Sequence, residues 1–87
     1  MLRIQRSANG EVVFKLSGRI DMENISELKT LLKAETNDHR IVLDLKDLTL
    51  VNRDAVIFLG YCEANEIKLK NCPPYIREWI KRERDGS

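Results

Sequence analysis

Alternating apolar and polar residues at the start of the chain predict two β-strands. The alternation runs over residues 2–6, and a second extended stretch over residues 11–16 is rich in β-branched and aromatic side chains. Between them stands Asn9-Gly10, which suits a type I′ turn because both central residues of that turn need positive φ. The pattern therefore predicts a β-hairpin.

Apolar residues next recur at helical spacing and predict a helix over residues 22–34, with a buried stripe of Ile25, Leu28, Leu31 and Leu32. Asp21 suits the N-cap of this helix, because its side-chain oxygen can accept a hydrogen bond from a free amide of the first turn. After a polar segment over residues 35–39, an almost continuous apolar run over residues 40–45 predicts a strand that is central in the sheet or buried on both faces.

The second half of the chain continues in the same manner. The pattern predicts a loop over residues 46–52 and a helix over residues 53–65. Asn52 suits the N-cap of this helix. Its predicted buried residues are Ala55, Val56, Leu59 and Cys62. A short alternating strand follows over residues 67–70, where two lysines protect a sheet edge from pairing with other chains. Pro73-Pro74 then opens a third helix, whose stripe is Ile76, Trp79, Ile80 and Glu83.

This order of elements, β-β-α-β-α-β-α, predicts an α/β fold in one domain spanning residues 1–87. Each β-α-β step requires parallel strands, and right-handed crossovers place the first two helices on the same face of the sheet. We therefore expect a four-stranded mixed sheet with an antiparallel edge and with helices mainly on one face. A chain of 87 residues has room for one small core, which favours a binding or regulatory module over an enzyme.

Charge narrows the range of partners. Fifteen basic and fourteen acidic residues leave a formal net charge of +1, so no basic excess points to nucleic acid or to an anionic membrane. The third helix mixes both signs, as is typical of a solvated helix face. Because the N-terminus lacks the apolar stretch of a signal peptide and no apolar run is long enough to span a bilayer, we expect a cytoplasmic protein without membrane insertion.

The sequence offers little catalytic or metal-binding chemistry. Cys62 and Cys72 lie ten positions apart and His39 is the single histidine, so a four-ligand zinc site would have to recruit carboxylates. Buried free thiols are the simpler interpretation, and a disulfide is the alternative. Nothing in the sequence nominates a nucleophile for His39, and the isolated glycines form no phosphate-binding loop. We expect no enzymatic activity, no cofactor and no metal.

Polar residues gather at one end of the predicted sheet. Residues 19–21 follow the second strand and residues 52–56 follow the third, so the carboxyl ends of two parallel strands present them together. Open α/β sheets bind their ligands at such an end. A helix cap beside a solvated arginine is the alternative interpretation. The candidate partner-binding surface consists of Arg19, Asp21, Asn52, Arg53, Asp54 and Val56.

Four segments, in this order, resemble the STAS domain family of sulfate-transporter and anti-sigma-factor-antagonist domains. Residues 13–21, which end in Gly-x-hydrophobic-Asp, resemble the strand before the family's first helix, and residues 42–45 resemble its central strand. Residues 47–51 are similar to the loop before its switch motif, and residues 67–73 to the strand and turn before a later helix. The resemblance implies a STAS-like sheet and a role in protein binding.

The family's bacterial regulatory members bind an anti-sigma factor that is also a serine kinase, and phosphorylation ends the binding. The phosphorylated hydroxyl stands in an Asp-Ser-Ser/Thr-Gly stretch at the start of the second helix, where helix amides stabilise a phosphate. The corresponding residues here are Asn52-Arg53-Asp54-Ala55, so no acceptor hydroxyl remains, and Thr49 is the nearest one. The resemblance therefore predicts a module without a phospho-switch.

Asp54 has two interpretations. It is either a fixed mimic of phosphate or an ordinary acid in a first helical turn, where the helix dipole favours it. The single charge of a carboxylate and the adjacent Arg53 favour the ordinary acid, because phosphate carries nearly two charges.

The function that the resemblance implies is that of an antagonist-like partner of an anti-sigma factor or a related serine kinase. The alternative is a small STAS subunit that binds a transporter ATPase or another assembly, and a homodimer is a further option. The chain is short for the resembled family, whose members commonly continue into a further strand and helix. This shortness favours an adaptor that is held in one state.

Overall fold

The computed structural model describes residues 2–8, 10–35 and 40–86. Asn9 of the predicted turn and His39 lie outside these described residues. The elements follow in the predicted order: β1 (Leu2–Ala8), β2 (Val12–Arg19), α1 (Met22–Ala34), β3 (Ile41–Leu50), α2 (Arg53–Ala64), β4 (Lys68–Lys70) and α3 (Pro74–Asp85).

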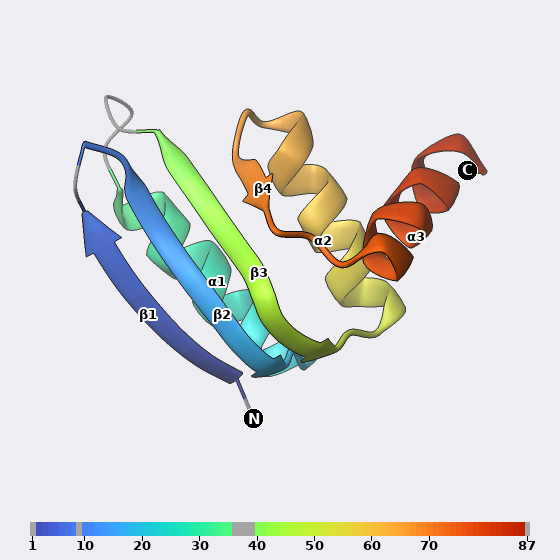
Figure 1. The fold of residues 1–87 in the computed structure, drawn as a ribbon, viewed down its shortest axis with the longest axis horizontal. Coiled ribbons are helices and arrows are strands. Elements are labelled where there is room, and N and C mark those ends of the chain that lie inside the picture. The colour runs from blue at the N-terminus through green and yellow to red at the C-terminus, as the bar shows by residue number, and fades with distance from the viewer. Residues whose placement is uncertain (1, 9, 36–39, 87) are drawn as a thin grey trace.

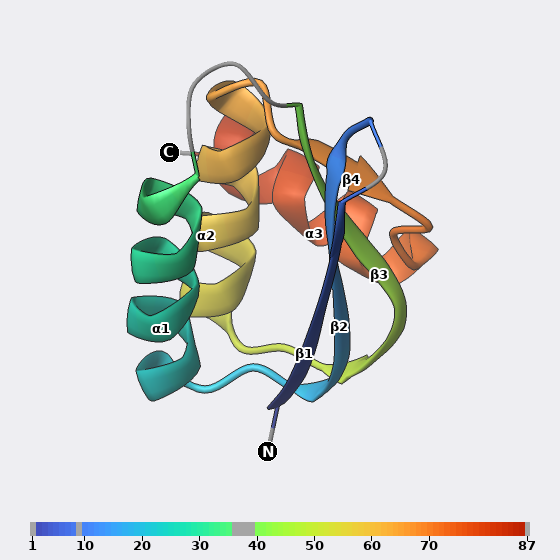
Figure 2. The same cartoon turned by 90° about the vertical axis from the view of Figure 1, so that its left-hand side faces the viewer.

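The four strands form one mixed sheet in the order β1-β2-β3-β4 (Figure 1). β1 pairs with β2 in antiparallel fashion, whereas β2 with β3 and β3 with β4 are parallel pairs. α1 and α2 lie on one face of the sheet, and α3 packs against α2 (Figures 1 and 2). The predicted α/β class, the antiparallel edge and the placement of the helices mainly on one face are confirmed.

A single apolar core lies between the sheet and the helices. The inward-facing residues of β2 and β3, such as the ladder partners Phe14 and Leu43, are almost completely buried. They belong to one cluster with Leu28 of α1, Leu59 of α2 and Ile76 of α3. All three helices therefore share one core with the sheet.

The two helices on the sheet are buried to different extents. In α1 only Leu28 is fully buried, and the rest of its predicted stripe is partly covered. A helix that is apolar on most sides is typical of a buried position, so α2 is the central helix of the layer. Its buried residues are Ala55, Val56, Phe58, Leu59, Gly60 and Cys62.

β3 is longer than the apolar pattern predicts. We expected the strand to end at Leu45 and a loop to span residues 46–52, but pairing with β2 resumes after a register shift and continues to Leu50. The shift returns Leu48 to the core, where it is 5% exposed. A bulge of this kind interrupts the alternation of inward and outward side chains, which is why the pattern did not predict one continuous strand.

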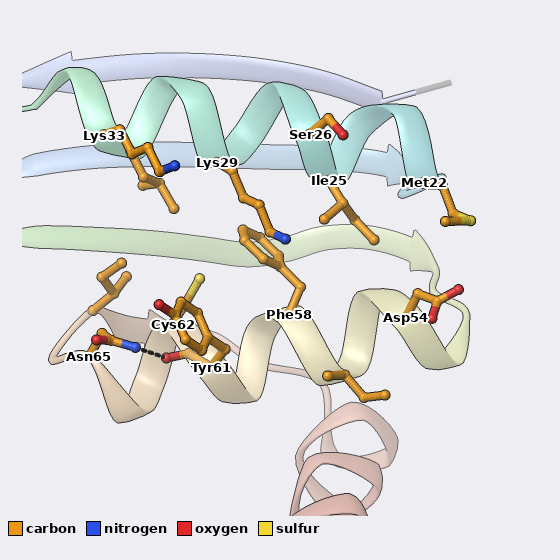
Figure 3. Close-up of a pocket in the computed structure, with 13 residues that line it drawn as sticks. Met22, Ile25, Ser26, Lys29, Lys33, Asp54, Phe58, Tyr61, Cys62 and Asn65 are labelled. Atoms are coloured by element: carbon orange, nitrogen blue, oxygen red, sulfur yellow. Dashed lines mark hydrogen bonds between the residues drawn. The ribbon is translucent and has the colours of Figure 1, made fainter.

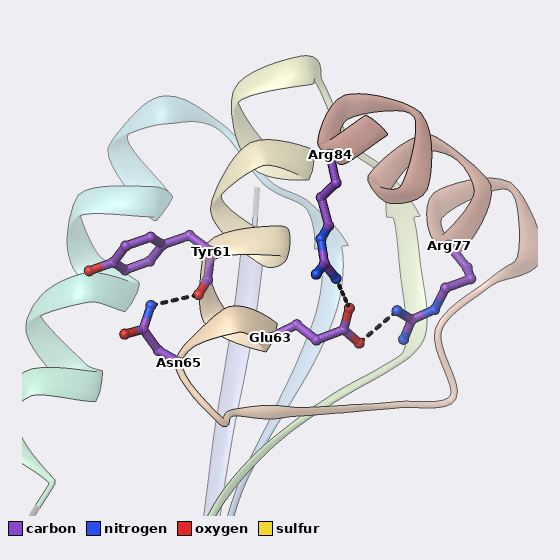
Figure 4. Close-up of polar contacts among 5 residues, drawn as sticks. All are labelled: Tyr61, Glu63, Asn65, Arg77 and Arg84. Atoms are coloured by element: carbon purple, nitrogen blue, oxygen red, sulfur yellow. Dashed lines mark hydrogen bonds and ion pairs between the residues drawn. The ribbon is translucent and has the colours of Figure 1, made fainter. Parts of the chain in front are cut away.

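Glu63 forms two of the ion pairs that fasten α3 to α2 (Figure 4). Glu63 of α2 accepts a hydrogen bond from Arg77 Nη1 at 2.6 Å and another from Arg84 Nη1 at 3.4 Å. The hydrogen bond to Glu63 is the main reason why the pKa of Arg77 is raised. Because Arg77 and Arg84 lie about two turns apart on α3, one carboxylate holds a long section of that helix.

Asp44 links β3 to β4 on the sheet face opposite the helices. Its carboxylate accepts hydrogen bonds from the backbone amide of Lys46 at 3.0 Å and from Asn71 Nδ2 at 3.2 Å. Partial burial opposes ionisation of Asp44, but these hydrogen bonds and the charges of Lys70 and Lys15 outweigh it and lower its pKa. The edge strand is therefore held in part by an ionised carboxylate.

Replacing Gly60 with alanine is expected to stabilise the fold. A β-carbon added at Gly60, in the middle of α2, would contact Cγ2 of Ile80 at 3.5 Å, an ordinary van der Waals distance. Alanine reduces the conformational freedom of the unfolded chain and favours the helix. Gly60→Ala should therefore raise the free energy of unfolding in urea by about 0.5–1 kcal/mol.

Gly18→Ala is the matched control for this change. Gly18 has a φ of 94°, which a residue with a side chain rarely adopts. The control should lose stability, whereas a loss in Gly60→Ala itself would mean that α2 and α3 leave no room for a methyl group.

Asp44→Asn should make the free energy of unfolding less sensitive to pH in the acidic range. The folded-state pKa of Asp44 lies below the unfolded value of about 3.9. The ionised carboxylate therefore stabilises the fold above that pH, and its contribution is lost as the pH falls through the folded-state pKa. In urea titrations from about pH 7 to about pH 2, the difference in stability between wild type and variant should shrink as the pH falls.

Asn71→Gly provides a graded control. Glycine tolerates the φ of 55° at this position but removes the side-chain donor to Asp44. It should give a pH dependence between those of wild type and Asp44→Asn. If the difference in the free energy of unfolding between wild type and Asp44→Asn stayed constant with pH, the ionised carboxylate would not be the stabilising form.

Candidate functional site

Two hydrogen bonds join the ends of β2 and β3, where α1 and α2 begin. Thr49 Oγ1 donates to the carbonyl oxygen of Gly18 at 2.9 Å, and the amide of Ile20 donates to the carbonyl oxygen of Leu50 at 3.2 Å. Both strands leave the sheet at this end, so their connections to the helices lie close together (Figure 1). The exposed polar residues here form a surface that we name the carboxyl edge: Arg19, Asp21, Asn52, Arg53 and Asp54.

Arg19 and Asp21 pair with each other at this edge. Arg19 Nε lies 3.1 Å from Asp21 Oδ1, and about half of each side chain is exposed. Asp21 occupies the N-cap of α1, and its backbone amide donates to Asn24 Oδ1 at 2.9 Å. An exposed ion pair of this kind contributes about 0–1 kcal/mol. Both side chains therefore remain accessible to a partner at little cost to the fold.

The three residues at the start of α2 differ in what they contact. Asn52 Oδ1 accepts a hydrogen bond from the backbone amide of Ala55 at 2.8 Å and so caps the helix. Arg53 is 73% exposed at its side chain, and its Nε lies 3.3 Å from Glu83 of α3. Asp54 lies in the first turn and lines a groove between α1 and α2 (Figure 3). Arg53 is therefore directed toward α3 and not toward Asp54.

Val56 does not belong to the exposed surface. Its side chain is 0% exposed and lies in the apolar core. Helical periodicity turns position 56 toward the core together with Leu59, so Val56 has no surface to offer a partner. This corrects the predicted extent of the site, whose other five residues are exposed or partly exposed.

The groove between α1 and α2 has a volume of about 710 Å³ and starts near the carboxyl edge (Figure 3). Three exposed apolar side chains line it: Met22 is 67% exposed, Ile57 47% and Tyr61 64%. Phe58 also lines it and is 4% exposed. The structure thus adds an apolar region to the polar edge that the sequence predicted.

Sequence reasoning missed this groove although a signal was present. Ile57, Phe58 and Tyr61 extend the apolar character of α2 beyond the stripe that contains Leu59. A helix that is apolar on most sides must pack against other elements besides the sheet to bury all of its apolar side chains. The sequence does not show how much of α2 is buried by α1 and α3, because this depends on side-chain packing between distant segments.

The described residues provide little reactive chemistry. They contain no cluster of three or more His, Cys, Asp or Glu side chains that could hold a metal ion. Both cysteines are free thiols. Burial raises the pKa of Cys62 to about 12 and also raises that of Cys72, so neither is activated as a thiolate at neutral pH. In the described part of the chain, no helix has the length and apolar content needed to cross a membrane.

Comparison with known proteins gives no assignment. No model of a known protein family matches the chain, and no curated protein matches it. The STAS resemblance therefore rests on the four sequence segments and on the order of the elements, and it stays a prediction.

Loss of the α2 cap should destabilise the protein. Asn52→Ala leaves the amide of Ala55 without its side-chain acceptor, and we expect the free energy of unfolding to fall by about 1 kcal/mol in urea titrations. Asn52→Asp should retain most of the stability, because aspartate is an equally good N-cap.

Arg53→Ala is the neighbouring control, because it removes an exposed ion pair and leaves the cap intact. Its effect should be smaller, at about 0–1 kcal/mol. If Asn52→Ala were no less stable than wild type, the helix would not depend on this hydrogen bond.

Proposed function

We propose that this protein is a non-enzymatic, STAS-like protein-binding module. It acts as an antagonist-like regulator that binds an anti-sigma factor or a related serine kinase, and it has no phospho-switch of its own. The observation that carries the proposal is the exposed first turn of α2, where Arg53 and Asp54 stand at the positions of the hydroxyl residues in the resembled family.

The carboxyl edge has properties that suit a partner-binding surface. Arg19, Asp21 and Arg53 present both signs of charge on accessible side chains. Their ion pairs lie in solvent and are easily exchanged for pairs with another protein. Charges of this kind guide association and select partners, so the edge favours recognition over chemistry.

Thr49 is a poor substitute for the missing hydroxyl acceptor. Its Oγ1 donates to the carbonyl oxygen of Gly18 at 2.9 Å and so helps to tie β3 to β2. Phosphorylation there would remove this hydrogen bond and add nearly two negative charges at the end of the sheet. The hydroxyl of Thr49 is therefore engaged in the sheet and is not free for transfer.

Asp54 gives the first turn of α2 one permanent negative charge. The helix dipole favours a carboxylate at this position. Arg53 pairs with Glu83 rather than with Asp54, which removes one of the two arguments against a phosphate-like role. A fixed charge suits an adaptor that holds one regulatory state.

Binding is tested with the purified full chain and the anti-sigma factors or serine kinases encoded beside its gene, by isothermal titration calorimetry. We expect one of them to form a defined complex that Arg53→Glu weakens about tenfold, because reversing a recognition charge replaces attraction with repulsion. Lys81→Glu is the matched control, since Lys81 is exposed on α3 outside the carboxyl edge. Complex formation only with a transporter ATPase would overturn the antagonist assignment and support the alternative subunit role.

A restored acceptor tests the missing switch. In the presence of the bound kinase and ATP, wild type should take up no phosphate, whereas Asp54→Ser should be phosphorylated at the new serine and should then release the kinase. Mass spectrometry locates the phosphate. Phosphorylation of wild type at Thr49, followed by release, would contradict a module without a switch.

A further inference from the structure

Exposed apolar side chains are concentrated along the groove between α1 and α2. Among the described residues, five large apolar side chains are strongly exposed, and three of them line this groove: Met22, Ile57 and Tyr61. Single exposed apolar residues are common on soluble proteins, but a group of them marks an interaction site. The groove is therefore the region of the described surface that gains most from being covered.

The dimensions of the groove match a short helix. Its α1 wall extends from Met22 to Lys33 and its α2 wall from Asp54 to Asn65, with lining residues spaced three or four apart. Twelve helical residues span about 16 Å, or three turns. The two helices start at the same end of the molecule and run in the same direction (Figure 1). A groove between two such helices accepts a third helix by packing of side-chain ridges into grooves.

Charges along the groove are separated by sign. Asp54 lies at the end where α1 and α2 begin, whereas Lys29 and Lys33 follow along the α1 wall (Figure 3). None of these three side chains forms an ion pair with another described residue. The complementary ligand is apolar along one face, acidic opposite the lysines and basic opposite Asp54.

The backbone dipoles select the direction of such a ligand. α1 and α2 both present their positive N-termini at the Asp54 end and their negative C-termini at the other end. A third helix that runs antiparallel to both places its own N-terminus at their C-termini, so the dipoles attract. Helices commonly carry acids in the first turn and bases in the last. In this direction those acids meet Lys29 and Lys33, and those bases meet Asp54.

We propose that this groove binds an amphipathic helix of about three turns from a partner protein, antiparallel to α1 and α2. A second copy of the chain fits less well, because its own α1 and α2 already lie on its sheet. A twofold contact would set one groove against another and leave both unfilled. This proposal does not depend on the regulatory role proposed above, since it rests on the groove, which shares only Asp54 with the carboxyl edge.

A designed peptide probe tests the proposal. It is a fluorescein-labelled helix of about 14 residues with one apolar stripe, two glutamates in the first turn and two arginines in the last. A second peptide exchanges these charges. In fluorescence anisotropy titrations with the full chain, the first peptide should bind about tenfold more tightly than the second. Its addition should shift amide NMR signals in α1 and α2 and leave those of β1 unchanged.

Variants of the protein complete a charge-exchange experiment. The double variant Lys29→Glu/Lys33→Glu should reverse the order of the two peptides. Lys46→Glu/Lys81→Glu carries the same change in net charge on exposed residues outside the groove and should preserve the order. Tyr61→Ala should weaken both peptides alike, because it removes apolar contact area without changing charge.

Three results would overturn the proposal: equal binding of the two peptides to wild type, NMR shifts outside the groove, or a dimer that Lys29→Glu/Lys33→Glu dissociates. Arg53→Glu separates this proposal from the regulatory one. It should change peptide binding much less than Lys29→Glu/Lys33→Glu does, because Arg53 points toward Glu83 and does not line the groove.

Discussion

The parallel pairing of β2 with β3 is the constraint on which the rest of the structure depends. It aligns their inward apolar residues, with Phe14 opposite Leu43. Parallel neighbours must be joined by a crossover, so α1 has to return across one face of the sheet. The next crossover has the same hand and sets α2 beside α1 in the same direction. Both helices consequently begin at one end. The carboxyl edge follows from the pairing of β2 with β3, and the groove follows once β4 pairs in parallel with β3.

Unequal packing of the two crossover helices explains why the groove stays open. α2 packs against both the sheet and α3. Glu63 of α2 also accepts hydrogen bonds from Arg77 and Arg84 of α3. α1 contributes one fully buried residue, Leu28, and its end is tied to β1 by a hydrogen bond of 2.6 Å from Arg6 Nε to Glu35. α1 packs against α2 less extensively than α3 does. The unfilled side therefore exposes the apolar residues that line the groove.

Much of the fold could be predicted from the sequence, because the regular spacing of apolar residues reflects which face of each element is buried. The failures occur where contacts between distant segments decide the outcome. The continuation of β3 to Leu50 depends on pairing with β2 after a register shift, which no local pattern reports. The direction of Arg53 depends on where α3 places Glu83. The inclusion of Val56 in the site was avoidable, because the predicted helix already placed Val56 among its buried residues.

The carboxyl edge and the groove share Asp54, and this shared residue connects the two proposals. Its carboxylate is exposed in the first turn of α2 and also lines the groove. A basic side chain of a helix in the groove would neutralise the charge that a partner meets at the edge. Binding at one surface would then change the affinity at the other, and linkage requires that the effect be equal in both directions. Under the two proposals, the occupancy of the groove therefore regulates the carboxyl edge without covalent modification.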